Sequence, residues 1–177
     1  MICQLAKNIR PYCIAFAVVL NCTSPVAAQG LGHQDRAAIQ ELSLAFITAF
    51  QAGDMATVIG FLPPKVLANI ASQNDMSPAK LSDTITQQST QAMSGLMIED
   101  FSMNFEDMNS GTTQAGRAYA LVPTTTILSA GSQTTRTRTR TLFFYDEGEW
   151  FLLRIENADQ VHFLTAVYKD FESIDFF

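Results

Sequence analysis

The spacing of the apolar residues changes at Gly95, and this change limits the fold more than any other feature of the sequence. Before Gly95 apolar residues recur three and four positions apart, as in Ile39, Leu42 and Phe46, which is typical of amphipathic helices. After it they alternate with polar residues, first over residues 101–106, which is typical of half-buried strands. Helices that all precede the strands favour an α+β fold over an alternating α/β fold.

Capping residues divide the first half of the chain into four helices. Asp35 and Asp54 are suitable N-caps, and Gly53 fits the left-handed position that commonly follows a helix. Ser77, followed by a proline, predicts the start of the fourth helix. We expect helices at about residues 34–52, 55–62, 65–72 and 78–93.

Turn residues divide the second half into four strands and a closing helix. We expect strands at about residues 101–106, 117–128, 134–145 and 150–156, separated by turns at 109–111, 130–131 and 147–148, and then a helix at 159–171. Pro123 lacks an N–H group within its strand, which favours an edge or a bulge, and bulges curve sheets. The predicted fold class is therefore α+β, with N-terminal helices packed on a curved four-stranded antiparallel meander and a C-terminal helix.

The first residues have the pattern of an export signal. Lys7 and Arg10 precede a short apolar run at residues 12–20, and the small residues at 26–28 suit signal peptidase. We expect cleavage between Ala28 and Gln29, and the apolar run is too short to span a bilayer. The expected division is 1–28 as a signal peptide, 29–34 as a flexible mature N-terminus and 35–177 as a single α+β domain.

The three cysteines all lie in this first segment. Cys22 follows an apolar run as the acylated cysteine of a bacterial lipoprotein does, but Asn21 stands where a small residue is usual. Lipoprotein anchoring at Cys22 is the alternative to a freely periplasmic or secreted protein. A chain cleaved after Ala28 keeps no cysteine, so it has neither disulfides nor a cysteine nucleophile.

Charge and motifs exclude several function classes. The chain has a formal net charge of -6, and cleavage after Ala28 removes two of its 11 bases but none of its 17 acids. Because nucleic-acid binders are usually basic, we expect no nucleic-acid partner. Nucleotide loops, hydrolase motifs and metal-ligand spacings are not found in the sequence, so we expect no cofactor and no metal site.

The most distinctive local pattern is the alternation of threonine and arginine at residues 135–141. In a strand this alternation places Arg136, Arg138 and Arg140 on one face, about 6.6–6.8 Å apart. Three fixed guanidinium groups could bind a carboxylate or phosphate. Alternatively, they pair with acids and protect a sheet edge from aggregation; the candidate acids are Glu99, Asp100, Glu106 and Asp107.

Turn positions also predict how the strands pair. A turn at 130–131 sets Arg136 opposite Thr125, Arg138 opposite Pro123 and Arg140 opposite Leu121. A turn at 147–148 sets Arg140 opposite Ile155, Leu142 opposite Leu153 and Phe144 opposite Phe151. The arginine face would then continue into an apolar face beneath the helices. Tyr119 and Trp150 are further candidates for lining a ligand pocket, although aromatic residues in strands are more often part of a core.

Two segments, FITAFQAGD at residues 46–54 and GEWFLL at 148–153, resemble the nuclear-transport-factor-like superfamily, also called the cystatin-like α+β cone. The resemblance covers about residues 35–156, and the expected final helix is not part of the usual pattern. Members include ketosteroid isomerases, dehydratases, SnoaL-like cyclases and many binding modules without catalytic activity. The resemblance therefore implies a fold and a pocket but does not select a function.

The sequence leads to two functional hypotheses. The first is an exported, non-enzymatic cell-envelope protein that binds a small apolar or anionic ligand or an envelope partner, with a homodimer through the sheet left open. Its expected ligand-binding residues are Arg136, Arg138, Arg140, Tyr119 and Trp150. The alternative is an isomerase- or cyclase-type enzyme that uses Glu156 or Asp100 with Tyr119 inside a cone-shaped pocket.

Overall fold

The computed structural model describes residues 30–177. The predicted signal peptide, its cleavage site at Ala28 and Gln29, and the alternative anchor at Cys22 all lie outside this part of the chain. Within it, no helix has both the length and the apolar character needed to cross a membrane.

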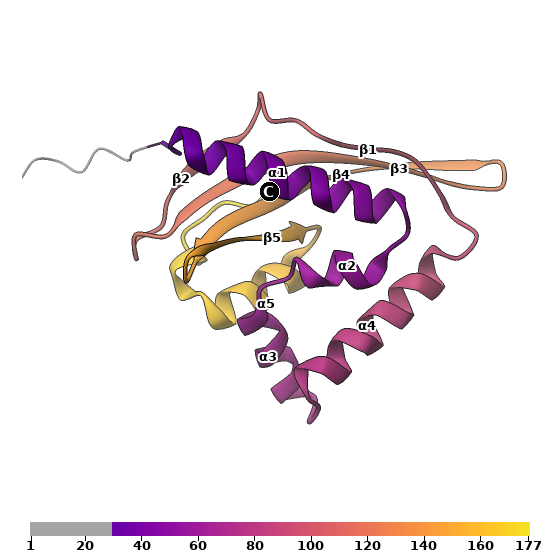
Figure 1. The fold of residues 1–177 in the computed structure, drawn as a ribbon, viewed down its shortest axis with the longest axis horizontal. Coiled ribbons are helices and arrows are strands. Elements are labelled where there is room, and N and C mark those ends of the chain that lie inside the picture. The colour runs from indigo at the N-terminus through magenta and orange to yellow at the C-terminus, as the bar shows by residue number, and fades with distance from the viewer. Residues whose placement is uncertain (1–29) are drawn as a thin grey trace, which may run out of the picture.

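Four helices form the first half of the domain, as predicted (Figure 1). They are α1 (His33–Gln51), α2 (Met55–Gly60), α3 (Pro64–Gln73) and α4 (Pro78–Met93). Gly53 has a φ of 70° and ends α1, while the Asp54 carboxylate caps α2 by accepting from the Thr57 N–H (3.1 Å). Ser77 caps α4 through the Lys80 N–H (3.2 Å). The capping residues therefore confirm the predicted helix starts at Met55 and Pro78.

An antiparallel sheet forms the second half. Its strands are β1 (Met97–Met103), β2 (Asn109–Thr112), β3 (Ala118–Ala130), β4 (Gln133–Asp146) and β5 (Glu149–Ile155). The order is β1-β3-β4-β5, with β2 also paired to β3. The turn predicted at residues 109–111 is instead the short strand β2. Because β1 pairs with only part of the long strand β3, the chain returns to pair with the remainder, at residues 118–121.

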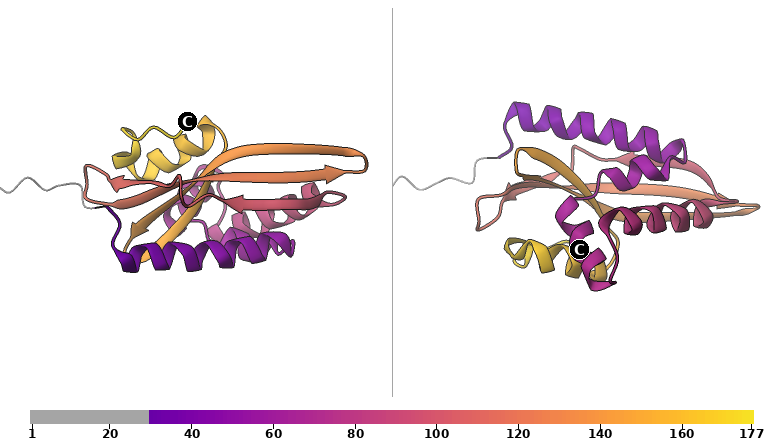
Figure 2. Two further views of the ribbon diagram at one scale, coloured as in Figure 1. Left: turned by 90° about the horizontal axis from the view of Figure 1, so that it is seen from above. Right: turned by 60° about the horizontal axis from the view of Figure 1, so that its bottom comes forward.

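Helices lie on both faces of the sheet (Figure 2). α1 packs across one face, which we call the α1 face. The other, which we call the α5 face, packs against α5 (Ala158–Val167), the single 3-10 turn Lys169–Phe171 and the C-terminal residues. The predicted α+β class, with helices first and a C-terminal helix last, is confirmed.

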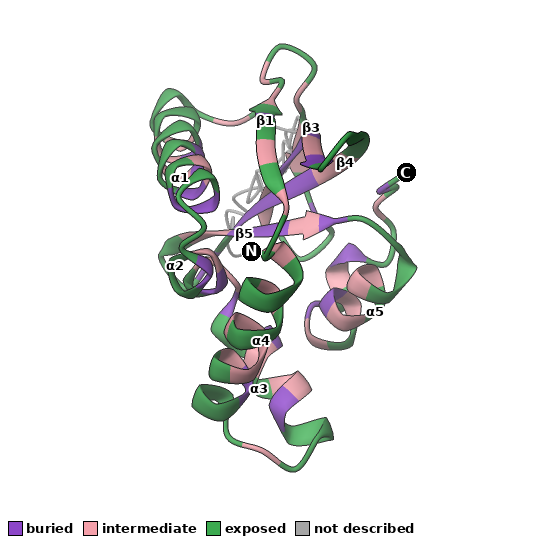
Figure 3. Ribbon diagram, turned by 90° about the vertical axis from the view of Figure 1, so that its right-hand side faces the viewer, coloured by how far each residue is buried: buried purple, intermediate pink, exposed green. Residues whose placement is uncertain are grey.

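Successive side chains of each strand point to opposite faces of the sheet, so the strands contribute apolar residues to two cores. Figure 3 shows the buried segments of the strands. On the α1 face, Phe50 of α1 packs against Phe101 of β1, with ring centroids 4.9 Å apart. On the α5 face, Phe144 of β4 packs against Phe171, with ring centroids 5.3 Å apart. Each such buried side chain stabilises the fold by about 1.5–3 kcal/mol, so both helical layers are held by the sheet.

The pairing of β4 with β5 confirms the prediction, whereas the pairing of β3 with β4 corrects it. Asp146 pairs with Glu149 as expected. Each arginine, however, lies opposite the β3 residue two positions later than predicted, so that Arg138 is opposite Thr125. The loop consists of Gly131 and the following serine, and Gly131 occupies its first position with a φ of 60°. A left-handed glycine suits that first position, so β3 ends one residue later and β4 begins one residue later than the predicted turn implies. The arginine face itself is unchanged, because a shift of two preserves alternation.

Candidate functional site

An apolar cavity of about 350 Å³ lies beside the edge strand β5. Six elements line it, each with at least one side chain: Phe50 from α1, Val58 from α2, Ile70 from α3, Ile85 from α4, Leu152 from β5 and Phe163 from α5. Because the N–H of Leu152 donates to the carbonyl of Phe61 (3.3 Å), the segment between α2 and α3 covers this sheet edge. The cavity therefore lies between the helices and β5, is partly open to solvent, and has a mostly apolar wall.

Arg154 and Glu156 are the charged residues in this wall. The Arg154 Nε contacts a carboxylate oxygen of Glu156 at 2.9 Å and donates to the hydroxyl of Thr139 at 3.3 Å. Its side chain is 19% exposed, against 42% for Glu156. None of the hydrogen bonds or ion pairs within residues 30–177 involves the two terminal nitrogens of Arg154. The guanidinium therefore keeps free donors beside an apolar cavity.

Local structure fixes these two side chains. Arg154 belongs to β5 and lies over the ring of Phe101, with its guanidinium carbon 5.8 Å from the ring centroid. The backbone N–H of Glu156 donates to Gln160 Oε1 (2.5 Å), which joins the end of β5 to the first turn of α5. Burial lowers the pKa of Arg154, and the negative charge of Glu156 opposes that change. An arginine remains cationic at any ordinary pH, so the cavity wall always includes a cationic side chain, next to its ion-pair partner Glu156.

The arginines predicted as an anion site lie elsewhere, on the α5 face of the β3–β4 hairpin that extends beyond the helices (Figures 1 and 2). Arg136 and Arg138 are exposed, and Arg140 is half-buried with Nη1 3.4 Å from the carbonyl oxygen of Asp175. Within the described residues, no ion pair involves any of the three.

The acids proposed as partners for these arginines have other contacts. Glu99 accepts a hydrogen bond from Ser129 (2.5 Å), Asp100 from Ser102 (3.2 Å) and Asp107 from Asn104 (2.8 Å). Glu106 donates its backbone N–H to the Asn104 side chain (3.0 Å). The expected charge pairing of the arginine face is not found among residues 30–177, and the side chains of Arg136 and Arg138 are exposed to solvent.

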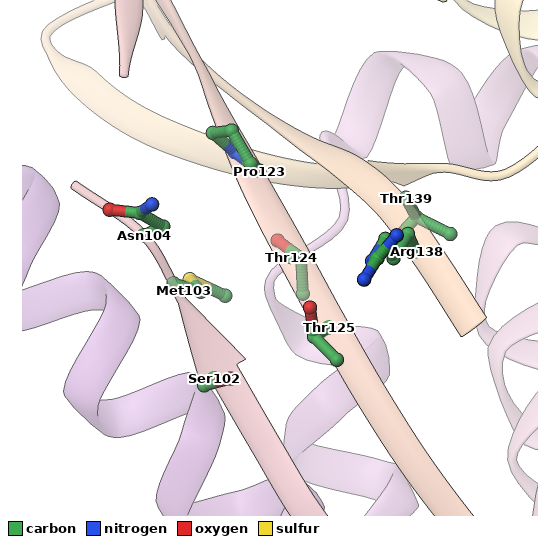
Figure 4. Close-up of a pocket in the computed structure, with 8 residues that line it drawn as sticks. All are labelled: Ser102, Met103, Asn104, Pro123, Thr124, Thr125, Arg138 and Thr139. Carbon is green, nitrogen blue, oxygen red and sulfur yellow. The ribbon is translucent and has the colours of Figure 1, made fainter. Parts of the chain in front are cut away.

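Arg138 lines two shallow hollows, of which Figure 4 shows the one over β1 and β3. One, of about 440 Å³, lies over β1 and β3 and is lined by Ser102 and Thr125. The other, of about 430 Å³, reaches Arg140 and Phe176. These open hollows have mixed polar and apolar linings, in contrast to the mostly apolar cavity at β5.

The two aromatic candidates do not join the arginines. Tyr119 lies on the same face, but it packs against Phe171 (6.0 Å between ring centroids) at the opposite end of β3. Trp150 lies on the α1 face and packs against Tyr145, with ring centroids 5.6 Å apart. The five predicted ligand-binding residues therefore occupy three separate places.

The three residues of the alternative enzymatic site are also dispersed. Asp100 pairs with Ile127, eight residues along β3 from Tyr119, which corresponds to about 26 Å. Glu156 follows Ile155, the residue of β5 that ends the sheet at this edge. Of the three, the apolar cavity includes Glu156 alone. The structure therefore does not bring the tyrosine together with either acid.

A second group of charges lies at the other end of the sheet. The carboxylate of Asp146 accepts from Lys65 (2.8 Å), Arg117 (2.5 Å) and Tyr168 (3.0 Å), and Arg117 also contacts Asp170 (3.1 Å). Burial raises the pKa of Asp146, but the three hydrogen bonds outweigh it and hold the pKa below its usual range. Every charge in this group is paired, so its role is to fix the C-terminal segment against the β4–β5 hairpin.

The structure adds one functional candidate that the sequence reasoning did not select, Arg154. A signal for it is visible in the sequence, because Arg154 is the only charge within the apolar run of residues 150–155. Arginine is rarely buried without a partner. Within residues 30–177, no cluster of three or more His, Cys, Asp or Glu side chains is arranged to hold a metal ion.

Fold and site together define an α+β domain with an apolar, arginine-bearing cavity at one sheet edge. Comparison of the chain with family models, curated proteins and solved structures finds no match.

Proposed function

We propose that this chain is an exported, non-enzymatic protein that binds a small amphipathic anion. The apolar body of the ligand would occupy the cavity beside β5, and its carboxylate would bind Arg154. The observation that carries the proposal is a guanidinium with free terminal nitrogens in the wall of an apolar cavity. The proposal agrees with the resemblance to the nuclear-transport-factor-like superfamily, whose members use the interior of the cone.

The size and lining of the cavity support the apolar half of the proposal. Its volume of about 350 Å³ lies at the lower end of the usual range for small-molecule sites, about 300–1,000 Å³. Burial of each CH2 group contributes about 0.8 kcal/mol. Affinity should therefore rise about fourfold with each added CH2 group until the cavity is filled.

The free donors of Arg154 support the anionic half. Glu156 and Thr139 contact Nε alone, so the two terminal nitrogens can bind both oxygens of a carboxylate. A hydrogen bond to a charged group contributes about 1.5–3 kcal/mol. Glu156 would oppose an incoming anion, and its greater exposure lets it turn toward solvent.

The state of Glu156 favours binding over catalysis. A general acid of the isomerase type works through a carboxyl group held in an apolar environment. The Glu156 side chain is instead 42% exposed and paired with Arg154. Export is supported by the residues at 7–28, and mass spectrometry should find a mature chain that begins at Gln29 and carries no lipid.

Calorimetric titration with n-alkyl carboxylates from hexanoate to tetradecanoate, and with the matching alcohols, tests the proposal. We expect affinity for the carboxylates to rise with chain length and then stop rising. Arg154→Met, which keeps an unbranched apolar stem without the guanidinium, should weaken carboxylate binding about tenfold or more and leave alcohol binding unchanged.

The matched control is Arg138→Met, which removes a guanidinium from the exposed sheet face. It should leave both ligand series unaffected. Equal affinity for carboxylates and alcohols, or a larger effect of Arg138→Met than of Arg154→Met, would overturn the assignment of Arg154.

A further inference from the structure

Among residues 30–177, part of β4 has a neighbouring strand on one side only. β5 ends at Ile155, which pairs with Arg140, whereas β4 continues to Gln133. Residues 133–139 therefore pair with β3 alone, and residues 133–138 are all exposed. This open segment lies on the hairpin that extends beyond the helices (Figure 2).

The backbone groups of the arginines face this open side. The N–H of Asn104 donates to the carbonyl of Pro123 (2.8 Å), so Pro123 directs its backbone polar group toward β1 and away from β4. In an antiparallel pair, opposite residues that do not exchange hydrogen bonds both point outward. Arg140, the partner of Pro123, therefore points its N–H and C=O away from β3, and by alternation so do Arg136 and Arg138.

The same residues carry the free charges. Arg136 and Arg138 make no ion pair within the described part of the chain, and they are about 6.6–6.8 Å apart on the α5 face. An added strand has the same two-residue repeat, so acidic side chains at alternate positions would lie beside these guanidinium groups. Arg136 and Arg138 thus offer both backbone pairing and charge complementarity.

We propose that residues 133–139 of β4 bind an extended acidic segment of another protein by strand addition. Backbone hydrogen bonds would hold the segment, and carboxylates at alternate positions would bind Arg136 and Arg138. A second copy of this chain is a poorer occupant. If residues 133–139 of two copies paired antiparallel about a twofold axis, the arginines of one copy would lie beside those of the other on the same face. Repulsion between these like charges would destabilise such a dimer. The proposal is independent of the cavity at β5.

Three labelled peptides of equal length and composition test this proposal against the full chain by fluorescence anisotropy. The first alternates Asp and Thr, the second groups all Asp residues at one end, and the third is the alternating peptide with N-methyl groups on the residues that would face β4. We expect the alternating peptide to bind at least tenfold more tightly than the other two.

Variants locate the site. Arg136→Gln and Arg138→Gln should each weaken binding of the alternating peptide about two- to fivefold, the range for an exposed charge pair. Lys80→Gln, which removes an exposed cation on α4, should leave the affinity for the alternating peptide unchanged. Circular dichroism spectra should show that the variants at these exposed positions remain folded.

Other outcomes overturn the proposal. Equal binding of the alternating and grouped peptides would indicate a general electrostatic surface without strand addition. Binding to vesicles that contain anionic lipid, without binding to any peptide, would assign the arginines to a membrane surface. Absence of binding to all probes, or concentration-dependent dimerisation lost in Arg138→Gln, would also contradict it.

Discussion

Asp146 and Arg154 are both shielded charged residues, but their contacts differ. Asp146 accepts hydrogen bonds from Lys65, Arg117 and Tyr168, which satisfies its carboxylate. Within the described part of the chain, the hydrogen bond and the ion pair of Arg154 both use Nε, which leaves its terminal nitrogens free. A fully paired charge fixes structure, whereas a charge with free donors at a cavity wall can bind a ligand. We therefore expect substitutions of Asp146 to act on stability and substitutions of Arg154 to act on binding.

Asp146→Asn should lower the free energy of unfolding by about 3 kcal/mol, because it leaves the guanidinium of Arg117 without one of its charged partners. Urea denaturation measures this change. Glu147→Gln is the matched control: it removes the exposed second partner of Lys65 and should cost less than about 0.5 kcal/mol. Similar losses in the two variants would contradict the role given to Asp146.

The stability of the protein should depend on pH through the same residue. The pKa of Asp146 is held low in the folded protein by its hydrogen bonds, against an unfolded value of about 3.9. Its contribution is therefore complete above that value and is lost as the pH falls through about 4 and toward the folded pKa. Denaturation between neutral pH and pH 3 should show a steeper loss for the natural chain than for Asp146→Asn. Parallel curves would exclude this linkage.

At the scale of elements, the caps and turns explain which features could be predicted. Asp54 and Ser77 determined the starts of α2 and α4, because capping acts within one turn of the chain. The β4–β5 register was predictable because Glu147 and Gly148 both have positive φ, of 49° and 97°, as that two-residue turn requires. At the β3–β4 loop, Gly131 could occupy either the first or the second position of a two-residue loop. The predicted pairing of β3 with β4 therefore differs from the observed pairing by two residues.

Gly131→Ala tests that loop. An alanine at a φ of 60° should destabilise the domain by about 1–2 kcal/mol. Gly60→Ala is the control and should stabilise the domain, because alanine favours helices and its added Cβ lies in open space within α2. Thermal denaturation should show a lower midpoint for the first variant only. A stabilised Gly131→Ala variant would show that the loop does not require its left-handed residue.

The candidate site was less predictable than the elements. Alternation at residues 135–141 is visible in one strand, so the arginine face could be identified from the sequence. The cavity depends on how α2, α3 and α4 pack against β5, and such contacts between distant elements leave no local pattern. Arg154 therefore became a candidate only once Ile70, Ile85 and Phe163 were found around it.

Ser89→Phe tests the cavity at the element scale. Ser89 lies on α4 and lines the cavity, so a phenyl ring there should fill it and weaken binding of alkyl carboxylates more than tenfold. Stability should be unchanged or higher, because filled cavities favour folding. Gln88→Phe adds the same ring at an exposed position of α4 and should leave binding intact. Undiminished binding to Ser89→Phe would place the ligand elsewhere.

At the scale of the whole molecule, three regions have different properties. The paired charges around Asp146 lie at one end of the sheet, and the apolar cavity lies beside β5. The β3–β4 hairpin extends from the other end (Figures 1 and 2), and its arginines form no ion pair with any residue that the structure describes. The proposed small-molecule site and the proposed protein-binding edge use different arginines, Arg154 in the first and Arg136 with Arg138 in the second, and they adjoin at Thr139, which accepts a hydrogen bond from Arg154.

A crystal structure of the protein with dodecanoate bound tests the central claim most directly. We predict that the alkyl chain lies between Ile70, Ile85 and Phe163, with its carboxylate about 2.7–2.9 Å from the terminal nitrogens of Arg154. A carboxylate in solvent, a ligand bound at Arg136 and Arg138, or a cavity closed by its own side chains would contradict the account.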